Sequence, residues 1–212
     1  MAGPSSAYPP WRRIAEGSAL FLAALLLAGC AGEARVQVAD AFPALIVAPR
    51  PVKLALVLDE RFRTAAAQPV KGVRIELGAA QTALFRQAFA ALAEELRVVD
   101  EGRLPPDSDL VVRPELLEVQ LATPADTYLN VYEVWLKYRV ALLTSGGEPL
   151  GEWQMAAYGR TPDGLLRSRE EAIRRAATVA LRDAGAKLAL DFYRAPPVAA
   201  WLARNALEVA GP

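Results

Sequence analysis

A long alternating pattern runs through Val131-Tyr132-Glu133-Val134-Trp135-Leu136-Lys137-Tyr138-Arg139-Val140-Ala141-Leu142. Its even-numbered positions are all hydrophobic, whereas Glu133, Lys137 and Arg139 stand at odd-numbered positions. This period of two predicts a long strand with one face buried and the other face in water. Ser145-Gly146-Gly147-Glu148 then predicts a tight turn, from which a second strand returns along the first. The return strand carries Trp153, Met155 and Ala157 on one face.

Shorter hydrophobic runs before this hairpin predict the rest of a sheet. The strand at residues 73–77 alternates with Arg74 and Glu76, which indicates that one of its faces is in water. Pro105-Pro106 separates an early group of elements from the strands that lead into the hairpin. The strands predicted in this way are residues 54–58, 73–77, 98–99, 110–112 and 116–121.

Two segments change to a helical period. Hydrophobic residues recur every three or four positions over residues 79–96, which predicts an amphipathic helix. Ser168 and Glu171 have the spacing of a capping box and open a second helix that extends to about residue 193. The inner face of this helix is built from alanines, so it can lie close to a sheet. Together these elements predict an α+β fold, a two-layer sandwich with a mainly antiparallel sheet and two amphipathic helices on one face.

The N-terminal segment has the features of a secretory signal. Arg12 and Arg13 precede an apolar run over residues 19–28, which is too short to cross a bilayer. Leu27-Ala28-Gly29-Cys30 resembles the bacterial lipobox, and this resemblance implies cleavage before Cys30 and lipidation of that residue. Cys30 is also the only cysteine of the chain. The alternative is an ordinary signal peptide that is followed by a cysteine by chance.

The domain organisation follows from these signals. Residues 1–29 are predicted as a lipoprotein signal peptide, residues 30–52 as a Pro-containing tether and residues 53–193 as the α+β domain. Residues 194–212 form a C-terminal tail. The lipobox resemblance implies a membrane anchor, and Ala31 in place of an aspartate implies the periplasmic face of the outer membrane.

Composition excludes several classes of function. The 24 basic and 24 acidic residues give no basic surplus for nucleic acid, and a chain without histidine lacks the usual base of serine and cysteine hydrolases. None of the serines after Cys30 has a lysine within four residues. We therefore expect no catalytic residue, no cofactor and no metal, and a protein that is not an enzyme. A divalent ion at Asp107 and Asp109 is the remaining alternative.

The water-facing row of the long strand is the candidate binding surface. It combines Trp135 with Lys137 and Arg139, and Trp153 lies on the neighbouring strand. Aromatic rings beside cations suit a protein interface, and they also suit a phosphorylated glycolipid or a polysaccharide. The alternative is that both tryptophans belong to the core.

The whole arrangement resembles the LPS-assembly lipoprotein family of the outer membrane. The lipobox at residues 27–30, the helix at 79–96, the hairpin at 131–158 and the helix at 168–193 carry this resemblance. It implies a non-catalytic, lipid-anchored accessory that binds an envelope protein in an outer-membrane assembly or transport machine. The alternative function is a periplasmic lipoprotein that carries a lipid or a glycan.

Overall fold

The computed structural model describes residues 33–38, 42–100, 102, 104–164 and 168–209. The signal peptide, Cys30 and Ala31 lie outside the described residues. The elements, in chain order, are β1 (Ala34–Gln37), β2 (Arg50–Val57), α2 (Glu60–Arg63), β3 (Ala66–Val70), β4 (Val73–Glu76), α3 (Gly78–Leu92), β5 (Ala93–Val99), β6 (Leu110–Ala122), α4 (Pro124–Thr127), β7 (Val131–Leu143), β8 (Pro149–Pro162), α5 (Arg169–Asp191), η1 (Phe192–Arg194) and α6 (Pro196–Val209).

The strands form two sheets, one of five strands in the order β5-β2-β6-β7-β8 and one of three in the order β1-β4-β3. Strands β6, β7 and β8 are antiparallel, as the alternating pattern predicted, but β2 runs parallel to both β5 and β6. The β2–β5 pair is parallel because the chain leaves β2 and returns to the start of β5 through α3. The α+β sandwich is thus confirmed, with sheets that are mixed rather than purely antiparallel.

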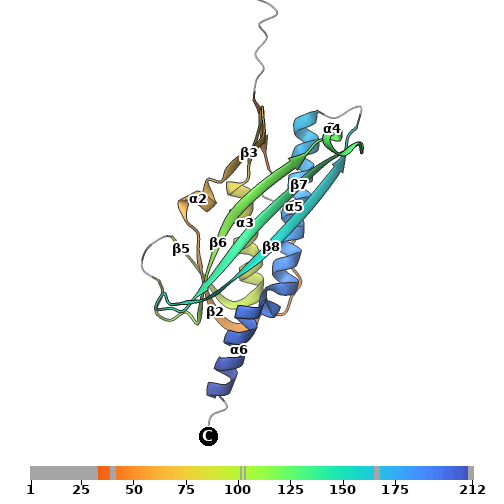
Figure 1. Cartoon of the computed structure of the whole chain (residues 1–212). Helices are drawn as coiled ribbons and strands as arrows, with labels where there is room; N and C mark the ends of the chain where they lie inside the picture. The colour runs from red at the N-terminus through yellow and green to blue at the C-terminus, as the bar shows by residue number, and fades with distance from the viewer. Residues whose placement is uncertain (1–32, 39–41, 101, 103, 165–167, 210–212) are drawn as a thin grey trace, which may run out of the picture. The chain divides into compact units, whose positions relative to one another are not determined.

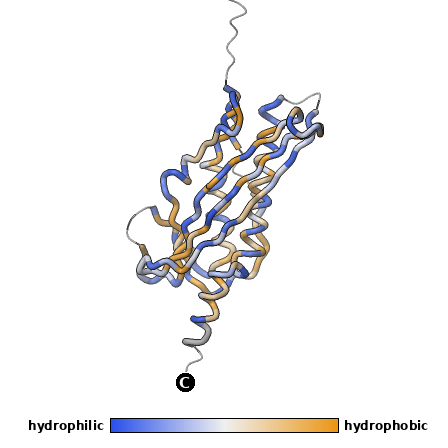
Figure 2. The backbone as a smooth tube through the Cα atoms, viewed as in Figure 1, coloured by the Kyte–Doolittle hydropathy of each residue, from blue (hydrophilic) through white to orange (hydrophobic). Residues whose placement is uncertain are grey.

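Helices α3 and α5 cover the same face of the five-stranded sheet, as predicted (Figure 1). The alanines of α5 that face the sheet are fully buried, and Gly159 of β8 lies directly beneath them. A Cβ atom at Gly159 would come within 2.2 Å of the Ala176 carbonyl oxygen. Small side chains on both elements therefore allow α5 to approach the sheet closely. The alternation of hydrophilic and hydrophobic residues along the strands is visible in Figure 2.

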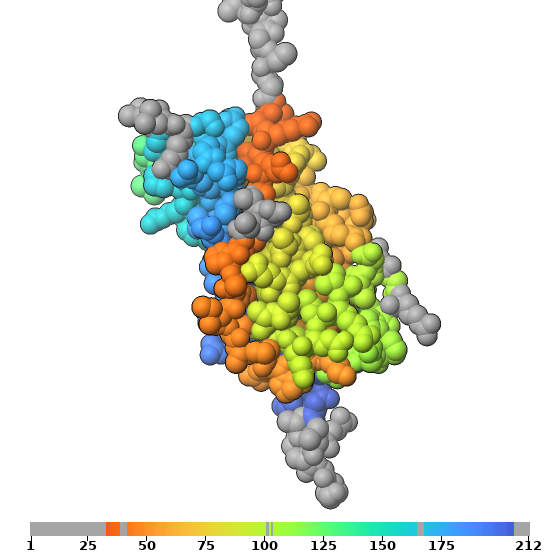
Figure 3. Space-filling view, turned by 180° about the vertical axis from the view of Figure 1, so that it is seen from behind, coloured from red at the N-terminus to blue at the C-terminus, as the bar shows by residue number. Residues whose placement is uncertain are grey.

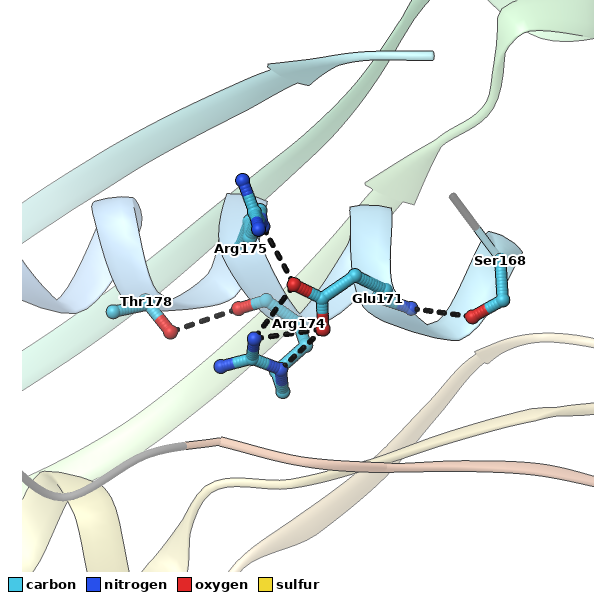
Figure 4. Close-up of polar contacts among 5 residues, drawn as sticks. All are labelled: Ser168, Glu171, Arg174, Arg175 and Thr178. Carbon is cyan, nitrogen blue, oxygen red and sulfur yellow. Dashed lines mark hydrogen bonds and ion pairs between the residues drawn. The ribbon is translucent and has the colours of Figure 1, made fainter. Parts of the chain in front are cut away.

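The first turn of α5 shows how the predicted capping box forms in part (Figure 4). The Glu171 backbone N–H donates to Ser168 Oγ over 3.2 Å, as expected of an N-cap serine. The Glu171 carboxylate does not return to the Ser168 backbone but accepts hydrogen bonds from Arg174 and Arg175. These hydrogen bonds, that of Arg175 first, hold the pKa of Glu171 below its ordinary value.

One helix ends earlier than its sequence pattern indicates. Helix α3 stops at Leu92, and residues 93–96 begin β5 instead of completing the expected helix. Leu96 lies opposite Leu54 in the parallel ladder. Pairing with β2 therefore overrides the helical preference of this short segment. At the other end of the chain, most of the expected tail is helix α6, and Trp201 is buried.

Part of the expected tether belongs to the folded domain. Strand β1 pairs with β4, and the side chain of Val36 is only 2% exposed. Residues 42–47 lie between α3 and α5 on the back of the domain (Figure 3), where Gln87 donates a hydrogen bond to the Pro43 carbonyl over 3.0 Å. Phe42, Leu45 and Val47 pack against the core. The prolines interrupt regular structure in this segment, but hydrophobic burial holds it against the domain.

Candidate functional site

The face of the five-stranded sheet opposite α3 and α5 is the first candidate surface. Near β5 this face is covered, because Leu104 packs over Ala55, Val57 and Val111. Over β6, β7 and β8 it carries polar, charged and aromatic residues that are partly or fully exposed. We call this part the open face, and its residues are Glu115, Glu118, Gln120, Glu133, Trp135, Lys137, Arg139, Glu152, Gln154, Ala156, Tyr158 and Arg160.

Trp135, Lys137 and Arg139 lie together on the open face, as the sequence predicted. The Trp135 ring lies 5.2 Å from that of Tyr158, its partner on β8. The Tyr158 hydroxyl donates to Glu133 Oε1 over 2.5 Å, and this bond raises the pKa of Tyr158. The aromatic pair is therefore held in a fixed orientation at the surface.

Arg139 is the centre of a charge cluster on the same face. Its guanidinium binds Glu115 of β6 and lies 3.8 Å from Glu152 of β8. The hydrogen bond to Glu115 raises the pKa of Arg139, so the cation persists at every physiological pH. Lys137 lies opposite Glu118 in the ladder. Acidic side chains on β6 thus lie beside basic side chains on the neighbouring strand β7.

A shallow hollow lies between this charge cluster and the aromatic pair. Its volume is about 180 Å³. The hollow is lined by Glu118, Gln120, Trp135, Leu136, Lys137 and Ala156. A tryptophan edge beside carboxylate, amide and ammonium groups can receive one small polar or aromatic group of a ligand.

Trp153 does not join this surface. It lies opposite Val140 in the ladder, and Val140 is one of the buried residues that face the helices. Trp153 is partly buried and packs against the core. The core interpretation therefore holds for Trp153, and Tyr158 contributes the second ring of the open face. The strict alternation along β8 was the signal that could have identified Tyr158, since residues 153 and 158 must point to opposite faces.

The second candidate site lies at the edge of β6. Strand β2 pairs with β6 only at residues 110–112, and no described strand pairs with the rest of β6 on that side. A groove of about 590 Å³ lies there between β6, α2 and β3. We call it the edge groove, and it is lined by Asp59, Arg61, Phe62, Ala65, Ala66, Ala67 and residues 115–119.

The wall of the edge groove is fixed by a buried polar link. Gln81, which is 0% exposed, donates to the Phe62 carbonyl over 2.6 Å and accepts from the Tyr138 hydroxyl over 3.1 Å. The Phe62 ring, 2% exposed, packs edge-on against Phe85 at 5.1 Å. Burial raises the pKa of Tyr138, so its hydroxyl remains a donor at all accessible pH values. These contacts tie α2 to α3 and β7.

The opposite edge of the sheet, at β8, is occupied by side chains of α5. The Tyr158 backbone N–H donates to Asp183 Oδ2 over 2.9 Å, and Lys187 Nζ donates to the Ala156 carbonyl over 2.5 Å. Asp183 and Lys187 also pair with each other over 2.8 Å. Backbone groups that another strand would need are already used at this edge.

A third feature, which the sequence analysis did not identify, is the tip beside α4. Tyr128 and Leu129 are 96% and 58% exposed. Tyr128 has a φ of 55°, a conformation that non-glycine residues rarely adopt. Thr123 and Asp126 form a capping box that fixes the turn before it, and the Thr123 hydrogen bonds lower the pKa of Asp126. The sequence signal for this tip is a Thr-x-x-Asp capping pattern at residues 123–126, which is followed closely by the hydrophobic residues Tyr128 and Leu129.

Four of the polar groups considered for chemistry, Ser108, Ser168, Asp107 and Asp109, have structural partners. Ser108 donates to the Pro105 carbonyl, and Ser168 caps α5. The Asp107 carboxylate binds Arg97, and that of Asp109 accepts the Lys53 backbone N–H. Within the described residues there is no group of three or more potential metal ligands. In the same part of the chain, no helix combines the length and hydrophobicity needed to cross a bilayer.

Comparison with known proteins gives similarities of structure only. No protein-family model matches the sequence, and no curated protein matches it either. The fold is shared with a putative neuraminyllactose-binding hemagglutinin homolog from Helicobacter pylori, at 10% identity and a TM-score of 0.52 over 82% of this chain and 100% of that one.

Two further solved structures with some similarity are bacterial lipoproteins. The minor lipoprotein from Acinetobacter baumannii has 13% identity and a TM-score of 0.45, with 70% of this chain and 96% of that one covered. Rare lipoprotein B from Shewanella oneidensis has 15% identity and a TM-score of 0.40, with 67% of this chain and 94% of that one covered.

Proposed function

We propose that this chain is a non-catalytic, lipid-anchored lipoprotein of the bacterial envelope that binds a protein partner. The observation that carries the proposal is the open face, where Trp135, Tyr158, Lys137 and Arg139 form an ordered row that no described element covers. Aromatic and arginine side chains contribute most of the binding energy in protein interfaces. Ser108, Ser168, Asp107 and Asp109 are instead engaged in structural contacts.

The anchor is proposed at Cys30, on the sequence of the lipobox. Strand β1 begins four residues later, at Ala34. Four residues span at most about 14 Å when fully extended. A lipid on Cys30 would therefore hold the start of the domain within a short distance of the bilayer. Confinement to a surface raises the effective concentration of the domain for a membrane-bound partner.

The partner is proposed to be a component of an outer-membrane assembly or transport machine, with the domain on the periplasmic side. A lipobox, a sheet and two helices on one face support this proposal, because the LPS-assembly lipoprotein family has the same arrangement. The lipid contributes only membrane attachment. Recognition of the partner depends on the domain surface.

Photocrosslinking in intact cells tests the proposal. A crosslinking amino acid at Lys137, which is exposed on the open face, is expected to capture one dominant envelope protein. The matched control is the same amino acid at Arg182, which is exposed on α5. Capture from neither position, or equal capture from both, would contradict binding through the open face. Release of a Cys30→Ala variant into the soluble periplasm tests the anchor separately.

A second candidate function is glycan binding. The Trp135–Tyr158 pair beside the small polar hollow is an arrangement that suits stacking on a sugar ring. The Helicobacter pylori protein that shares the fold is named for neuraminyllactose binding. Titration of the domain lacking residues 1–30 with neuraminyllactose tests this function. Saturable binding that is lost in Trp135→Ala and kept in Trp153→Phe would favour it over protein binding.

A further inference from the structure

We propose that the edge groove binds an extended segment of a partner protein, which adds as a strand to the free edge of β6. This inference deepens the proposed function, because it names how a partner would be held. It rests on the pairing of the strands, the lining of the groove and the pattern of charge beside it.

The backbone of β6 offers free hydrogen-bonding groups to the groove. The Tyr158 N–H points away from β7, toward Asp183. Its partner in the ladder, Trp135 of β7, therefore directs its backbone groups away from β8. These groups point toward Gln120, the partner of Trp135 on β6. Gln120 therefore points its groups toward β7. The neighbouring residues Val119 and Leu121 must then point theirs away from β7, toward the side of the groove. No backbone group of the described residues forms a hydrogen bond with these outward groups.

The free edge of β6 can pair with an incoming strand, but two features limit the length over which it can pair. Pro114 lies in β6 at a position before the groove and has no N–H, so pairing is limited to the residues that follow it. Strand β6 also contains a bulge between Leu116 and Glu118. Bulges and prolines at a strand edge limit how far a neighbouring strand can extend. The free edge is thus a short segment rather than an unlimited template for aggregation.

The two faces of β6 differ in chemistry, and this difference selects the occupant. Leu116, Val119 and Leu121 lie opposite residues that face the helices, so they belong to the hydrophobic side. Glu115 and Glu118 lie opposite Arg139 and Lys137 on the open face. Side chains of an added strand alternate between these two faces and contact their cross-strand neighbours.

The partner segment is therefore one in which hydrophobic residues alternate with lysine or arginine. The hydrophobic residues would pack toward Phe62 and the alanines of residues 65–67, which line the groove. The basic residues would lie beside Glu115 and Glu118 on the open face. This continues the order already present across the sheet, in which acidic side chains on β6 lie beside basic ones on β7.

The volume of the groove agrees with a short segment. About 590 Å³ accommodates a few medium-sized side chains together with part of their backbone. Phe62 at its wall is held by Gln81 and Phe85, so the site is largely formed before binding. Strand addition of this kind takes its affinity from main-chain hydrogen bonds and its specificity from alternate side chains.

Peptide binding to the domain lacking residues 1–30 tests the inference. The probe is a fluorescent peptide of sequence Lys-Val-Lys-Val-Lys-Val-Lys, and fluorescence anisotropy reports its binding. The Val119→Pro variant removes the outward N–H without touching the ladder to β7, and it is expected to weaken binding about tenfold. The Glu118→Lys variant is expected to weaken it about fivefold. The matched control, Glu148→Lys in the hairpin turn, is expected to leave it unchanged.

Three outcomes of the peptide titration would overturn the inference. These are no saturable binding of the probe, equal binding by the wild type and Val119→Pro, or equal binding of a probe whose valines carry N-methyl groups. Circular dichroism of each variant shows whether it is folded. Concentration-dependent dimerisation that Val119→Pro abolishes would identify a second copy as the occupant, and it would also contradict a partner segment. Loss of crosslinking in cells, by contrast, bears on the proposed function and leaves the peptide result unaffected.

Discussion

The two long edges of the antiparallel part of the sheet are treated differently. At β8, Asp183 and Lys187 of α5 occupy the backbone groups of Tyr158 and Ala156. At β6, the corresponding groups face a groove and have no described backbone partner. Unpaired strand edges invite association, and proteins usually block them. A domain that blocks one edge and leaves the other open has an edge available for a partner.

The largest expected effect comes from separating α5 from the sheet. In Gly159→Ala the new Cβ would lie 2.2 Å from the Ala176 carbonyl oxygen and 2.3 Å from the Ala180 backbone nitrogen. Helix α5 must then move, and the free energy of unfolding is expected to fall by about 3 kcal/mol. Urea unfolding measures the change. In the control Gly146→Ala the nearest atom is 3.6 Å away, and a similar loss there would contradict the packing argument.

The next effect concerns the wall of the edge groove. Tyr138→Phe removes the hydroxyl that donates to Gln81 and leaves a buried amide oxygen without its donor. The free energy of unfolding is expected to fall by about 1–2 kcal/mol, and binding of the basic peptide should weaken as α2 loosens. Thermal unfolding and anisotropy measure the two effects. Tyr132→Phe is the matched control, and it should change stability by less than about 0.5 kcal/mol.

Removal of the Asp183 side chain should leave the edge of β8 with a free backbone N–H, as at the edge of β6. In Asp183→Ala the Tyr158 N–H loses its acceptor, and stability is expected to fall by about 1 kcal/mol. Self-association through β8 should increase, which sedimentation velocity detects. Asp191→Ala, at the end of the same helix, should behave as the wild type. A monomeric Asp183→Ala protein at every concentration would show that this capping does not protect the edge.

The smallest effect is the pH dependence that arises at the start of α5. Because the pKa of Glu171 is lowered in the folded state, its carboxylate contributes stability above its ordinary pKa of 4.5. That contribution is lost as the pH falls below 4.5 through the lower pKa of the folded state. The Glu171→Gln variant should therefore show a flatter decline of stability in acid. Equal acid slopes for variant and wild type, measured by urea unfolding, would contradict this assignment.

The parts of the fold that local pattern governs were predictable from sequence. The alternation of residues 131–142 and the glycines of the turn give the β7–β8 hairpin, in which Gly147 adopts a φ of 90°. The alanines of α5 and its cap at Ser168 were likewise predicted and observed. These features depend on neighbours within a few residues, or on a simple period.

The rest depends on contacts between distant segments. Residues 93–96 have helical preferences, and only pairing with β2 makes them a strand. The edge groove exists because β2 pairs with three residues of β6 and then turns away into α2, a length that no local pattern encodes. Trp135, Lys137 and Arg139 lie on one face of the sheet, as the alternating pattern predicted, because they share one strand. Trp153 lies on the other face because its register places it opposite Val140, which faces the helices.

Amide hydrogen exchange tests the contrast between the two edges most directly. In the free domain the Tyr158 amide should be protected by Asp183, and the Val119 amide should exchange rapidly although it lies within a long strand. Addition of the lysine–valine peptide should protect Val119 and leave Tyr158 unchanged. A Val119 amide that is already protected in the free domain, or that stays unprotected when the peptide is saturating, would contradict an open edge that receives a partner strand.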